Sequence, residues 1–336
     1  MKAAVWRGPR DIRVEDVNDP KLEADGILIK VKVAGICGSD IHRWKIGGVK
    51  EARMEVGQVL GHEFSGEVID VGANVTNIKK GQRVTATGVG LRLNLPGGFA
   101  EYVSIPKAIL NRNVYLLPDE VSYEEGAMVE PLVVGINVAK KAKPVAEDTV
   151  AILGLGIIGQ TAMQVYKALG VSKIIVSEIG KKRLDLAKEI GVADVIINAL
   201  EDDPIERVKE ATAGLGADIV AECAGAPVTF LQAVEMVRGR QIDMERMKLI
   251  PGGKIVLAAI YETPIEWFPN RVVFNNIDML GLMGGEGTFP DAIDLVKAGK
   301  VNLKPLISHE FSLDDAREAF ETHLKTNESV KILIKP

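Results

Sequence analysis

Residues 150–159 read VAILGLGIIG, and this stretch decides the fold of the middle of the chain. Its four leading apolar residues predict a buried strand. The glycines that follow, Gly154, Gly156 and Gly159, have the G-x-G-x-x-G spacing of a dinucleotide-binding turn. Gly154 makes the tight turn, Gly156 lets the backbone approach a pyrophosphate, and Gly159 lets the helix pack closely on the strand. Because a helix N-terminus also offers amide hydrogens to phosphates, the stretch predicts a nucleotide site.

Strand and helix patterns alternate after this turn, which predicts a parallel, doubly wound sheet. The expected strands are 150–153, 173–177, 194–197, 218–222 and 253–259, and the expected helices are 156–169, 181–190 and 205–212.

The first 120 residues read differently, as strands and turns near 27–33, 66–72, 81–84 and 98–103. A capping box at 122–125 opens a helix where the pattern changes. The tail predicts helices near 291–298 and 313–324 and a closing strand at 330–334. We expect it to rejoin the β-rich part. The expected domains are therefore 1–134 with 285–336, and 135–284 as the dinucleotide-binding insertion.

A carboxylate follows the second expected strand, nineteen residues past Gly159: Glu178. A carboxylate there can bond both adenosine ribose hydroxyls and repels a 2′-phosphate, which favours NAD over NADP. Arg183 and the lysines at 181–182 weaken this preference, because cations tolerate the extra phosphate.

A second motif points to a metal ion. Cys37 follows the strand at 27–33 on a glycine-punctuated turn, and His62 and Glu63 lie on another turn. A thiolate, an imidazole and a carboxylate can hold zinc and leave its fourth position open, as catalytic zinc sites do. Zinc to activate an alcohol and a nicotinamide to take its hydride together suggest an alcohol dehydrogenase.

The composition excludes several other classes. At 336 residues the chain should hold two domains, and a net charge of −5 argues against nucleic acid as a main partner. No apolar run is long enough for a membrane span and no secretory signal is present. The two distant cysteines make a disulfide framework improbable and favour the cytoplasm.

The sequence resembles the zinc-dependent medium-chain alcohol dehydrogenases, most closely their polyol branch, typified by sorbitol dehydrogenase. The resemblance implies an α/β protein with a GroES-like, mostly-β catalytic domain and a Rossmann domain. The stretches that carry it are 35–42 (GICGSDIH), 60–63 (LGHE), 125–132 (EGAMVEPL), the glycine turn, 221–226 (AECAGA) and 304–309 (KPLISH).

The resemblance implies that Cys37, His62 and Glu63 are the zinc ligands. Glu130 stands where classical alcohol dehydrogenases have a second cysteine, and it binds either the zinc or the zinc-bound water. Asp40 is expected behind His62, where it would fix the imidazole tautomer.

Ser39 is expected to pass the substrate proton, through the nicotinamide ribose, to His42, whose free pKa near 6.5 suits a relay. A solvated turn histidine is the alternative for His42. The resemblance adds three cofactor contacts to those of the glycine turn: Ile158, Ala258 and Leu282.

The chain also departs from the family. Residues 85–98 contain no cysteine, so one catalytic zinc and no structural zinc are expected. Gly284 and Gly285 stand where sorbitol dehydrogenases have a substrate-binding arginine, which argues against sorbitol itself. Residues 238–250 are longer than is usual, and an exposed helix is favoured there over a subunit contact. The candidate pocket residues are Trp44, Phe99 and Glu101.

The expected activity is hydride transfer to NAD from a secondary hydroxyl of a polyol, vicinal diol or related alcohol. The alternatives are an L-threonine 3-dehydrogenase and a catalytically inactive nucleotide-binding protein. The resemblance further implies a homodimer or homotetramer that joins near 274–284.

Overall fold

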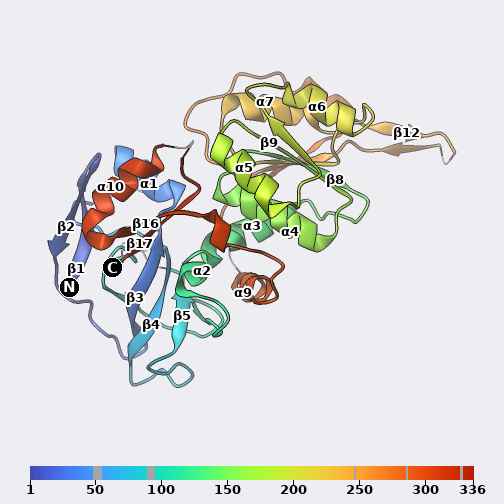
Figure 1. The fold of residues 1–336 in the computed structure, drawn as a ribbon. Helices are drawn as coiled ribbons and strands as arrows, with labels where there is room; N and C mark the ends of the chain where they lie inside the picture. Colours follow the sequence, from blue (N-terminus) through green and yellow to red (C-terminus); the bar gives the residue numbers. More distant parts are fainter. Residues whose placement is uncertain (48–54, 89–94, 246, 285–286, 326–327) are drawn as a thin grey trace. The chain divides into compact units, whose positions relative to one another are not determined.

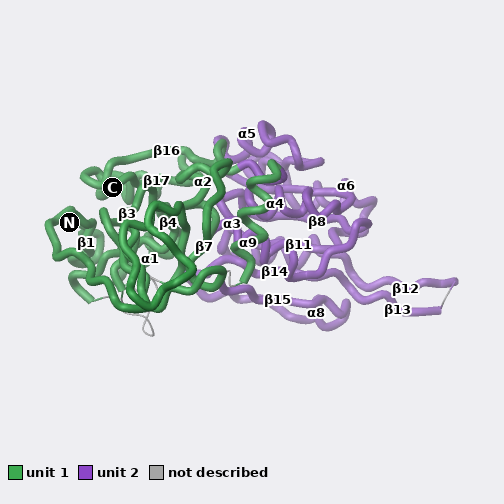
Figure 2. The backbone as a smooth tube through the Cα atoms, turned by 90° about the horizontal axis from the view of Figure 1, so that it is seen from below, with its two compact units in different colours: residues 1–130, 287–299, 303–336 green, residues 131–286, 300–302 purple. Residues whose placement is uncertain are grey.

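The computed structural model describes residues 1–47, 55–88, 95–245, 247–284, 287–325 and 328–336 (Figure 1). The chain forms two compact units (Figure 2). The first contains residues 1–130, 287–299 and 303–336, and the second contains residues 131–286 and 300–302. Among the described helices, none combines the length and the apolar run that crossing a bilayer requires.

The first unit is built on a seven-stranded sheet whose central strand is β3 (Ile27–Gly35). Side chains of β3 alternate between buried and partly exposed positions over most of its length, as expected of a strand with one face on a core. It pairs antiparallel with β4, β6 and β17, so the last strand of the chain lies beside one of the first. The remaining strands of the unit are β1 (Lys2–Gly8), β2 (Asp11–Asp16), β4 (Glu63–Val71), β5 (Arg83–Ala86), β6 (Tyr102–Ile105), β7 (Val114–Leu116), β16 (Ile307–Ser312) and β17 (Lys331–Lys335).

Short helices close this unit. Phe320, on α10, packs edge-on against Trp44 and Phe99 with ring centroids 5.6 Å apart in each case. All three rings are fully or almost fully buried, so they form the centre of the core rather than an accessible surface. The helices are α1 (Gly38–Ile46), α2 (Tyr123–Ala127), α9 (Phe289–Lys297) and α10 (Ala316–His323), with the 3-10 turns Lys304–Leu306 and Leu313–Asp315; α3 (Val129–Lys141) begins here and continues into the second unit.

The second unit contains the expected doubly wound sheet, with every neighbouring pair of strands parallel. The order is β10-β9-β8-β11-β14-β15, which is the 3-2-1-4-5-6 order of dinucleotide-binding folds. The order reverses between β8 and β11, and ligands bind at the carboxyl ends of strands at such a point. The strands are β8 (Thr149–Leu153), β9 (Lys173–Glu178), β10 (Val195–Asn198), β11 (Ile219–Glu222), β14 (Lys254–Leu257) and β15 (Asp278–Gly281). The helices are α4 (Ile157–Leu169), α5 (Lys181–Ile190), α6 (Pro204–Ala211), α7 (Pro227–Met236) and α8 (Asn270–Asn275).

Residues 238–250 contain no helix where the structure describes them, so the expected helix extension is wrong. They form a hairpin of β12 (Gln241–Asp243) and β13 (Lys248–Ile250), which extends away from the helices of its unit (Figure 1). Ile242 lies opposite Leu249 on one face, whereas Asp243 lies opposite Lys248 on the other. A period of two explains why the apolar residues do not form a helical stripe.

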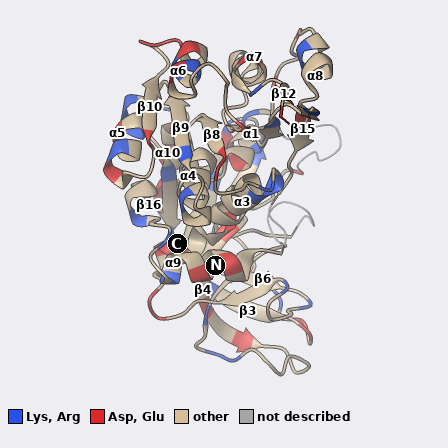
Figure 3. Cartoon of the chain, turned by 90° about the vertical axis from the view of Figure 1, so that its right-hand side faces the viewer, with Lys and Arg blue, Asp and Glu red and all other residues tan. Residues whose placement is uncertain are grey.

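Charged side chains of both signs are interspersed on α5 and α6 of the second unit (Figure 3). Several form ion pairs one helical turn apart, such as Lys181 with Asp185 and Lys209 with Glu206. Such faces are typical of solvated helices rather than of the single-sign stripes that bind a phosphate backbone.

Candidate active site

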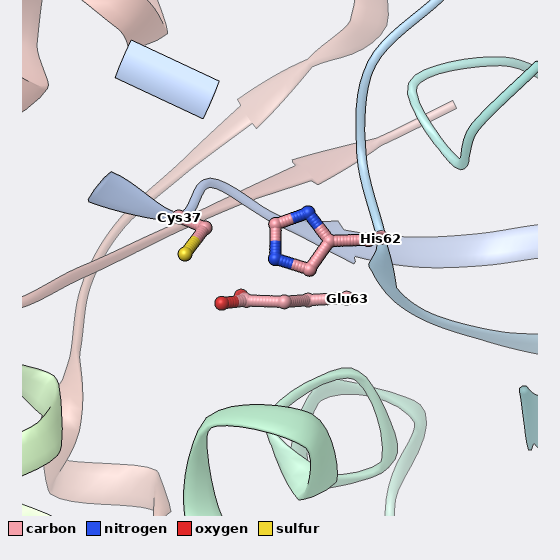
Figure 4. A group of neighbouring side chains, drawn as sticks. All are labelled: Cys37, His62 and Glu63. Atoms are coloured by element: carbon pink, nitrogen blue, oxygen red, sulfur yellow. The ribbon is translucent and has the colours of Figure 1, made fainter. Parts of the chain in front are cut away.

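Three side chains that could ligate a metal converge at one end of the first unit's sheet. One donor atom from each of Cys37, His62 and Glu63 lies within 4.8 Å of the others, and the side chains point toward one another (Figure 4). His62 and Glu63 are buried and Cys37 is partly exposed. The group is therefore largely shielded from water, and Cys37 is its most exposed member.

The sheet positions these donors. Gly35, the last residue of β3, lies directly opposite Glu63, the first residue of β4. Cys37 follows two residues after Gly35 and is the N-cap of α1, where its amide donates to the Asp40 carboxylate at 3.1 Å. Gly61 has a φ of 96°, and a side chain there would meet Phe99, so the turn before His62 requires glycine.

Lys331 is a member of this site that the sequence interpretation missed. It is 1% exposed, its ammonium contacts Glu63 Oε2, and it donates to the Ile36 carbonyl oxygen at 2.9 Å. A Cβ at Gly35 would overlap both Glu63 and Lys331, so this glycine leaves room for the pair. The sequence signal that could have identified it is a single lysine inside the otherwise apolar strand 330–334, since a buried lysine needs a charged partner.

Asp40 lies behind His62, as expected. Its Oδ1 is 3.4 Å from His62 Nδ1, close enough for an electrostatic contact but without a hydrogen bond. Burial opposes protonation of His62, yet the Asp40 and Cys37 charges outweigh burial and raise the pKa of His62 well above its usual value. Burial would raise the pKa of Asp40, but His62, the Cys37 amide and Lys331 hold it below its usual value.

Glu130 lies close enough to the group to interact with its charges, although it is not one of the three clustered donors. Burial raises its pKa to about 7; Glu63 and Asp40 add to this effect, whereas His62 and Lys331 oppose it. This position is compatible with either of the roles expected for Glu130.

The donors fit a zinc ion. With bonds of about 2.0–2.3 Å, the ligand atoms of tetrahedral zinc lie about 3–4 Å apart, so donors within 4.8 Å need only small movements. Asp40 faces Nδ1 of His62, which leaves Nε2 for the metal, as in carboxylate–histidine–zinc arrangements. Lys331 occupies one oxygen of Glu63 and leaves the other available.

Ser39 and His42 lie on α1, so the alternative of a solvated turn histidine does not describe His42. Their spacing of three residues places them on one face of the helix. The Ser39 hydroxyl oxygen is inaccessible to water and has no hydrogen-bond partner among the described residues. A buried hydroxyl without a partner is costly in a folded protein, so Ser39 retains hydrogen-bonding capacity that a bound group could use.

The glycine turn of the second unit matches its expected geometry. A Cβ at Gly159 would overlap the carbonyl oxygen of Gly154, and a Cβ at Gly154, whose φ is 87°, would come within 2.8 Å of Ala224. Gly156, the N-cap of α4, has open space where its side chain would stand. The turn is closed on the protein side and open where a pyrophosphate would approach.

Glu178 ends β9 beside this turn and is 6% exposed. Its Oε1 accepts from the amides of Ile179 and Gly180 at 2.8 and 2.9 Å, and Oε2 accepts from the Leu155 amide at 2.7 Å. Arg183 Nη1 lies 3.6 Å from Oε2. The carboxylate therefore orders the glycine turn and retains only part of its capacity for a ribose.

The other expected cofactor contacts lie near the carboxyl edge of the sheet. Ile158 is in the first turn of α4 and is partly exposed. The amides of Ala258 and Leu282 continue the strand pairing beyond β14 and β15, donating to the carbonyl oxygens of Glu222 and Leu257.

The candidate pocket residues are only partly compatible with the structure. Trp44 and Phe99 are 2% and 0% exposed and pack on Phe320, so their assignment to a pocket is wrong. Glu101 is partly exposed and accepts from the Lys2 amide at 2.7 Å. Of the glycine pair, Gly284 has a φ of 71° and residue 285 lies outside the described residues.

Two family models match the chain. An alcohol dehydrogenase GroES-like domain matches residues 23–119, and a zinc-binding dehydrogenase model matches residues 158–298. The first covers Cys37, His62 and Glu63, and the second covers most of the doubly wound sheet.

Curated relatives match over nearly their full length. The (R,R)-butanediol dehydrogenase of Bacillus subtilis (strain 168) is 34% identical over 100% of both chains. The sorbitol dehydrogenase of the same organism is also 34% identical, over 100% of this chain and 97% of its own. An L-threonine 3-dehydrogenase of Chelativorans sp. (strain BNC1) is 32% identical over 99% and 98%.

Solved dehydrogenase structures are similar to this chain over its whole length. The 2R,3R-butanediol dehydrogenase of Bacillus subtilis superposes with a TM-score of 0.86 at 33% identity, covering 100% of this chain and 99% of its own. A protein from Sinorhizobium meliloti 1021 bound to NADP gives 0.85 at 27%, and an alcohol dehydrogenase from E. coli CFT073 with NADH gives 0.84 at 26%; both cover 100% and 99%.

Replacing Lys331 by Met should destabilise the metal-free protein by about 3–5 kcal/mol, because it leaves the Glu63 carboxylate buried and unpaired. The free energy of unfolding, measured by urea denaturation with a chelator present, tests this. The double substitution Lys331→Met/Glu63→Gln should recover most of the loss.

The matched control is Lys335→Met on the same strand, whose lysine is 42% exposed and pairs with Glu124 and Glu310. It should change the stability by less than about 1 kcal/mol. A Lys331→Met protein as stable as the wild type would contradict the importance of the buried pair.

Proposed function

The chain belongs to the zinc-binding alcohol dehydrogenases with a GroES-like domain, and on that premise we propose that it oxidises a secondary hydroxyl of a vicinal diol or polyol with NAD. It is a dehydrogenase that uses zinc and a nicotinamide cofactor. The observation that carries the proposal is the convergence of Cys37, His62 and Glu63 in a chain that also folds a dinucleotide-binding sheet.

We assign one zinc ion per chain to these three residues. Zinc acts as a Lewis acid that acidifies the alcohol's hydroxyl, while the nicotinamide accepts the hydride. Glu63 would ligate through the oxygen that Lys331 leaves available, and Asp40 would orient the His62 ring. Glu130 would bind either the ion or its water.

The proton of the substrate hydroxyl would leave through α1. Ser39 is the first acceptor, because its buried hydroxyl has unused hydrogen-bonding capacity. His42, three residues further on the same face and partly exposed, would receive the proton through the nicotinamide ribose and pass it to solvent. The proposed path therefore runs along α1 from the buried Ser39 hydroxyl to the partly exposed His42.

The names of the first relatives support a diol or polyol, since one acts on butanediol and the other on sorbitol. Two glycines at 284–285, in place of the arginine expected for sorbitol, favour a substrate without the sorbitol pattern of hydroxyls. A threonine dehydrogenase is supported by a relative of slightly lower identity.

We further propose that NAD is preferred to NADP. The Glu178 carboxylate stands at the expected ribose position and Arg183 is turned toward it, so the pair adds little positive charge for a 2′-phosphate. The pyrophosphate would bind at the first turn of α4, above Gly156.

We also propose that the chain has two domains, one of residues 1–134 with 285–336 and one of residues 135–284. The cytoplasm suits its two free cysteines.

Self-association is a separate proposal. The edge strand β15 has no neighbour on one side among the described strands, and exposed apolar side chains surround it, including Phe274 at 63% and Met283 at 83%. An exposed apolar strand edge is a template for pairing with another chain. We propose that a second copy pairs there.

The activity test is NAD reduction across vicinal diols, polyols, simple secondary alcohols and threonine. Turnover on diols or polyols should disappear with a chelator and return with zinc. Cys37→Ser should reduce turnover to background and bound zinc well below one per chain, while NADH affinity stays within about threefold, because the thiolate ligates the metal only.

Cys223→Ser is the control, since it removes the other cysteine and should leave zinc content and turnover unchanged. A Cys37→Ser protein that retains zinc and most activity would refute the metal assignment. Turnover on threonine alone would favour the amino alcohol alternative.

The ratio of kcat/KM for NAD to that for NADP measures the cofactor preference. We expect at least about tenfold for the wild type. Arg183→Gln should increase the ratio, because the Glu178 charge then loses its neighbour. Lys188→Gln, on the last turn of the same helix, serves as control and should not change it. A wild-type ratio below one would contradict the proposal.

Light scattering after size exclusion tests self-association. The wild type should elute as a dimer or tetramer, and Met283→Lys should shift it toward smaller species, because a buried lysine opposes edge pairing. Met247→Lys, at the hairpin turn and 78% exposed, is the matched control. A monomeric wild type would refute the proposal, and dissociation by Met247→Lys alone would move the contact to the hairpin.

A further inference from the structure

A buried carboxylate outside the metal group occupies the carboxyl end of β11 in the second unit. Glu222 is 0% exposed. Its Oε1 accepts from the amides of Ala224 and Gly225 at 3.0 and 2.9 Å and from the Thr229 hydroxyl at 2.7 Å. One oxygen thus orders the turn after β11 and the start of α7.

The second oxygen of Glu222 reaches a different loop. Oε2 accepts from the Tyr261 hydroxyl at 2.5 Å, and Tyr261 lies in the loop that follows β14. Its ring packs edge-on against Phe230 of α7, with centroids 6.1 Å apart. Burial and the bond to the Glu222 carboxylate raise the pKa of Tyr261 far above its usual value, so it remains a donor.

The two loops also contact each other through a glycine. Gly225 has a φ of 73°, and a Cβ there would come within 2.7 Å of the Ile260 carbonyl oxygen and 3.1 Å of Ala259. The turn after β11 also contacts the glycine turn at 154–159, since a Cβ at Gly154 would come within 2.8 Å of Ala224. Three turns at the carboxyl edge are therefore held together, and Glu222 bonds two of them.

These loops stand on one side of the point where the strand order reverses. Glu178, the expected adenosine-ribose residue, ends β9 on the other side, so the nicotinamide half of the dinucleotide would lie over the ends of β11, β14 and β15. Residues 258–261 lie there, and Ile260 is 62% exposed. No feature of the metal chemistry requires a tyrosine in this loop.

We infer that Glu222 and Tyr261 are positioning residues for the nicotinamide half of the cofactor. They hold residues 258–261 in place before the cofactor binds. The binding of NAD then does not have to pay the entropy of ordering this loop, and the nicotinamide ring is held in one orientation. The inference rests on the proposed function, because it requires that the sheet bind NAD.

Tyr261→Phe tests the inference by removing only the hydroxyl. We expect the Kd for NADH, followed by nucleotide fluorescence, to rise about tenfold, because the loop must then be ordered by the ligand. The Kd for AMP, which occupies only the adenine half, should stay within about twofold. The KM for NAD should rise and kcat should fall, since a misplaced ring transfers hydride poorly.

Glu222→Gln and the double variant complete the cycle. Glu222→Gln should also raise the Kd for NADH. Adding Tyr261→Phe to it should raise the Kd little further, because both substitutions act on the same bond, between the Tyr261 hydroxyl and the Glu222 carboxylate. Tyr166→Phe is the matched control: its hydroxyl donates to the Val138 carbonyl oxygen at 3.4 Å, and its loss should not change NADH binding.

The outcomes separate the two proposals. A Tyr261→Phe protein that binds NADH like the wild type, or loses AMP and NADH affinity in parallel, refutes the positioning role and leaves the proposed function intact. A wild type that binds neither nucleotide refutes the proposed function and, with it, this inference.

Discussion

The pairing of buried charges at the end of β3 is the constraint on which the first unit depends. An isolated charge in the interior costs several kcal/mol, so Glu63 needs its partner Lys331, which lies 268 residues further along the chain. The partners meet only if β17 lies beside β3 and Gly35 leaves room for both side chains. This requirement accounts for a first unit that contains both ends of the chain, with the second unit inserted between them.

The second unit uses buried carboxylates in a different way. Glu178 and Glu222 each end a parallel strand and accept backbone amides from the turn that follows. Backbone amides in a tight turn need acceptors, and a carboxylate supplies two oxygens in a fixed place. The turns that would hold a dinucleotide are thus ordered by the protein itself, which reduces the entropy lost on binding.

Local signals were enough to predict much of this arrangement. The glycine spacing at 154–159 and the alternation after it predicted the doubly wound sheet, because both depend on neighbours in sequence. The tail was expected to rejoin the β-rich part, but the partners within it were not predictable: nothing near Glu63 indicates Lys331. An exposed helix was expected at 238–250 although the apolar residues there form no helical stripe; the pairing of Ile242 with Leu249 across a turn is not detected by helical spacing. Trp44 and Phe99 were predicted to line a pocket, but an aromatic side chain in the sequence can equally belong to a core. Their packing against Phe320, which is distant in the sequence, shows that they belong to the core.

Charge balance at the metal group bears on which alcohol it accepts. With the proposed zinc ion bound, the two negative charges of a Cys37 thiolate and the Glu63 carboxylate would be offset by the metal. Lys331 and Asp40 add one charge of each sign, and Glu130 adds a further negative charge whenever it is ionised. A neutral diol or polyol enters such a site without electrostatic penalty. Only when Glu130 is ionised would the zinc-loaded group keep one uncompensated negative charge, and a substrate carboxylate about 4 Å from it would then be disfavoured by about 4 kcal/mol at an effective dielectric constant of about 20. Lys331 offers little to offset it, since its ammonium is already bonded to Glu63. On the proposed zinc assignment, the electrostatics of the group therefore favour a neutral polyhydroxy substrate over one that directs a carboxylate toward Glu130.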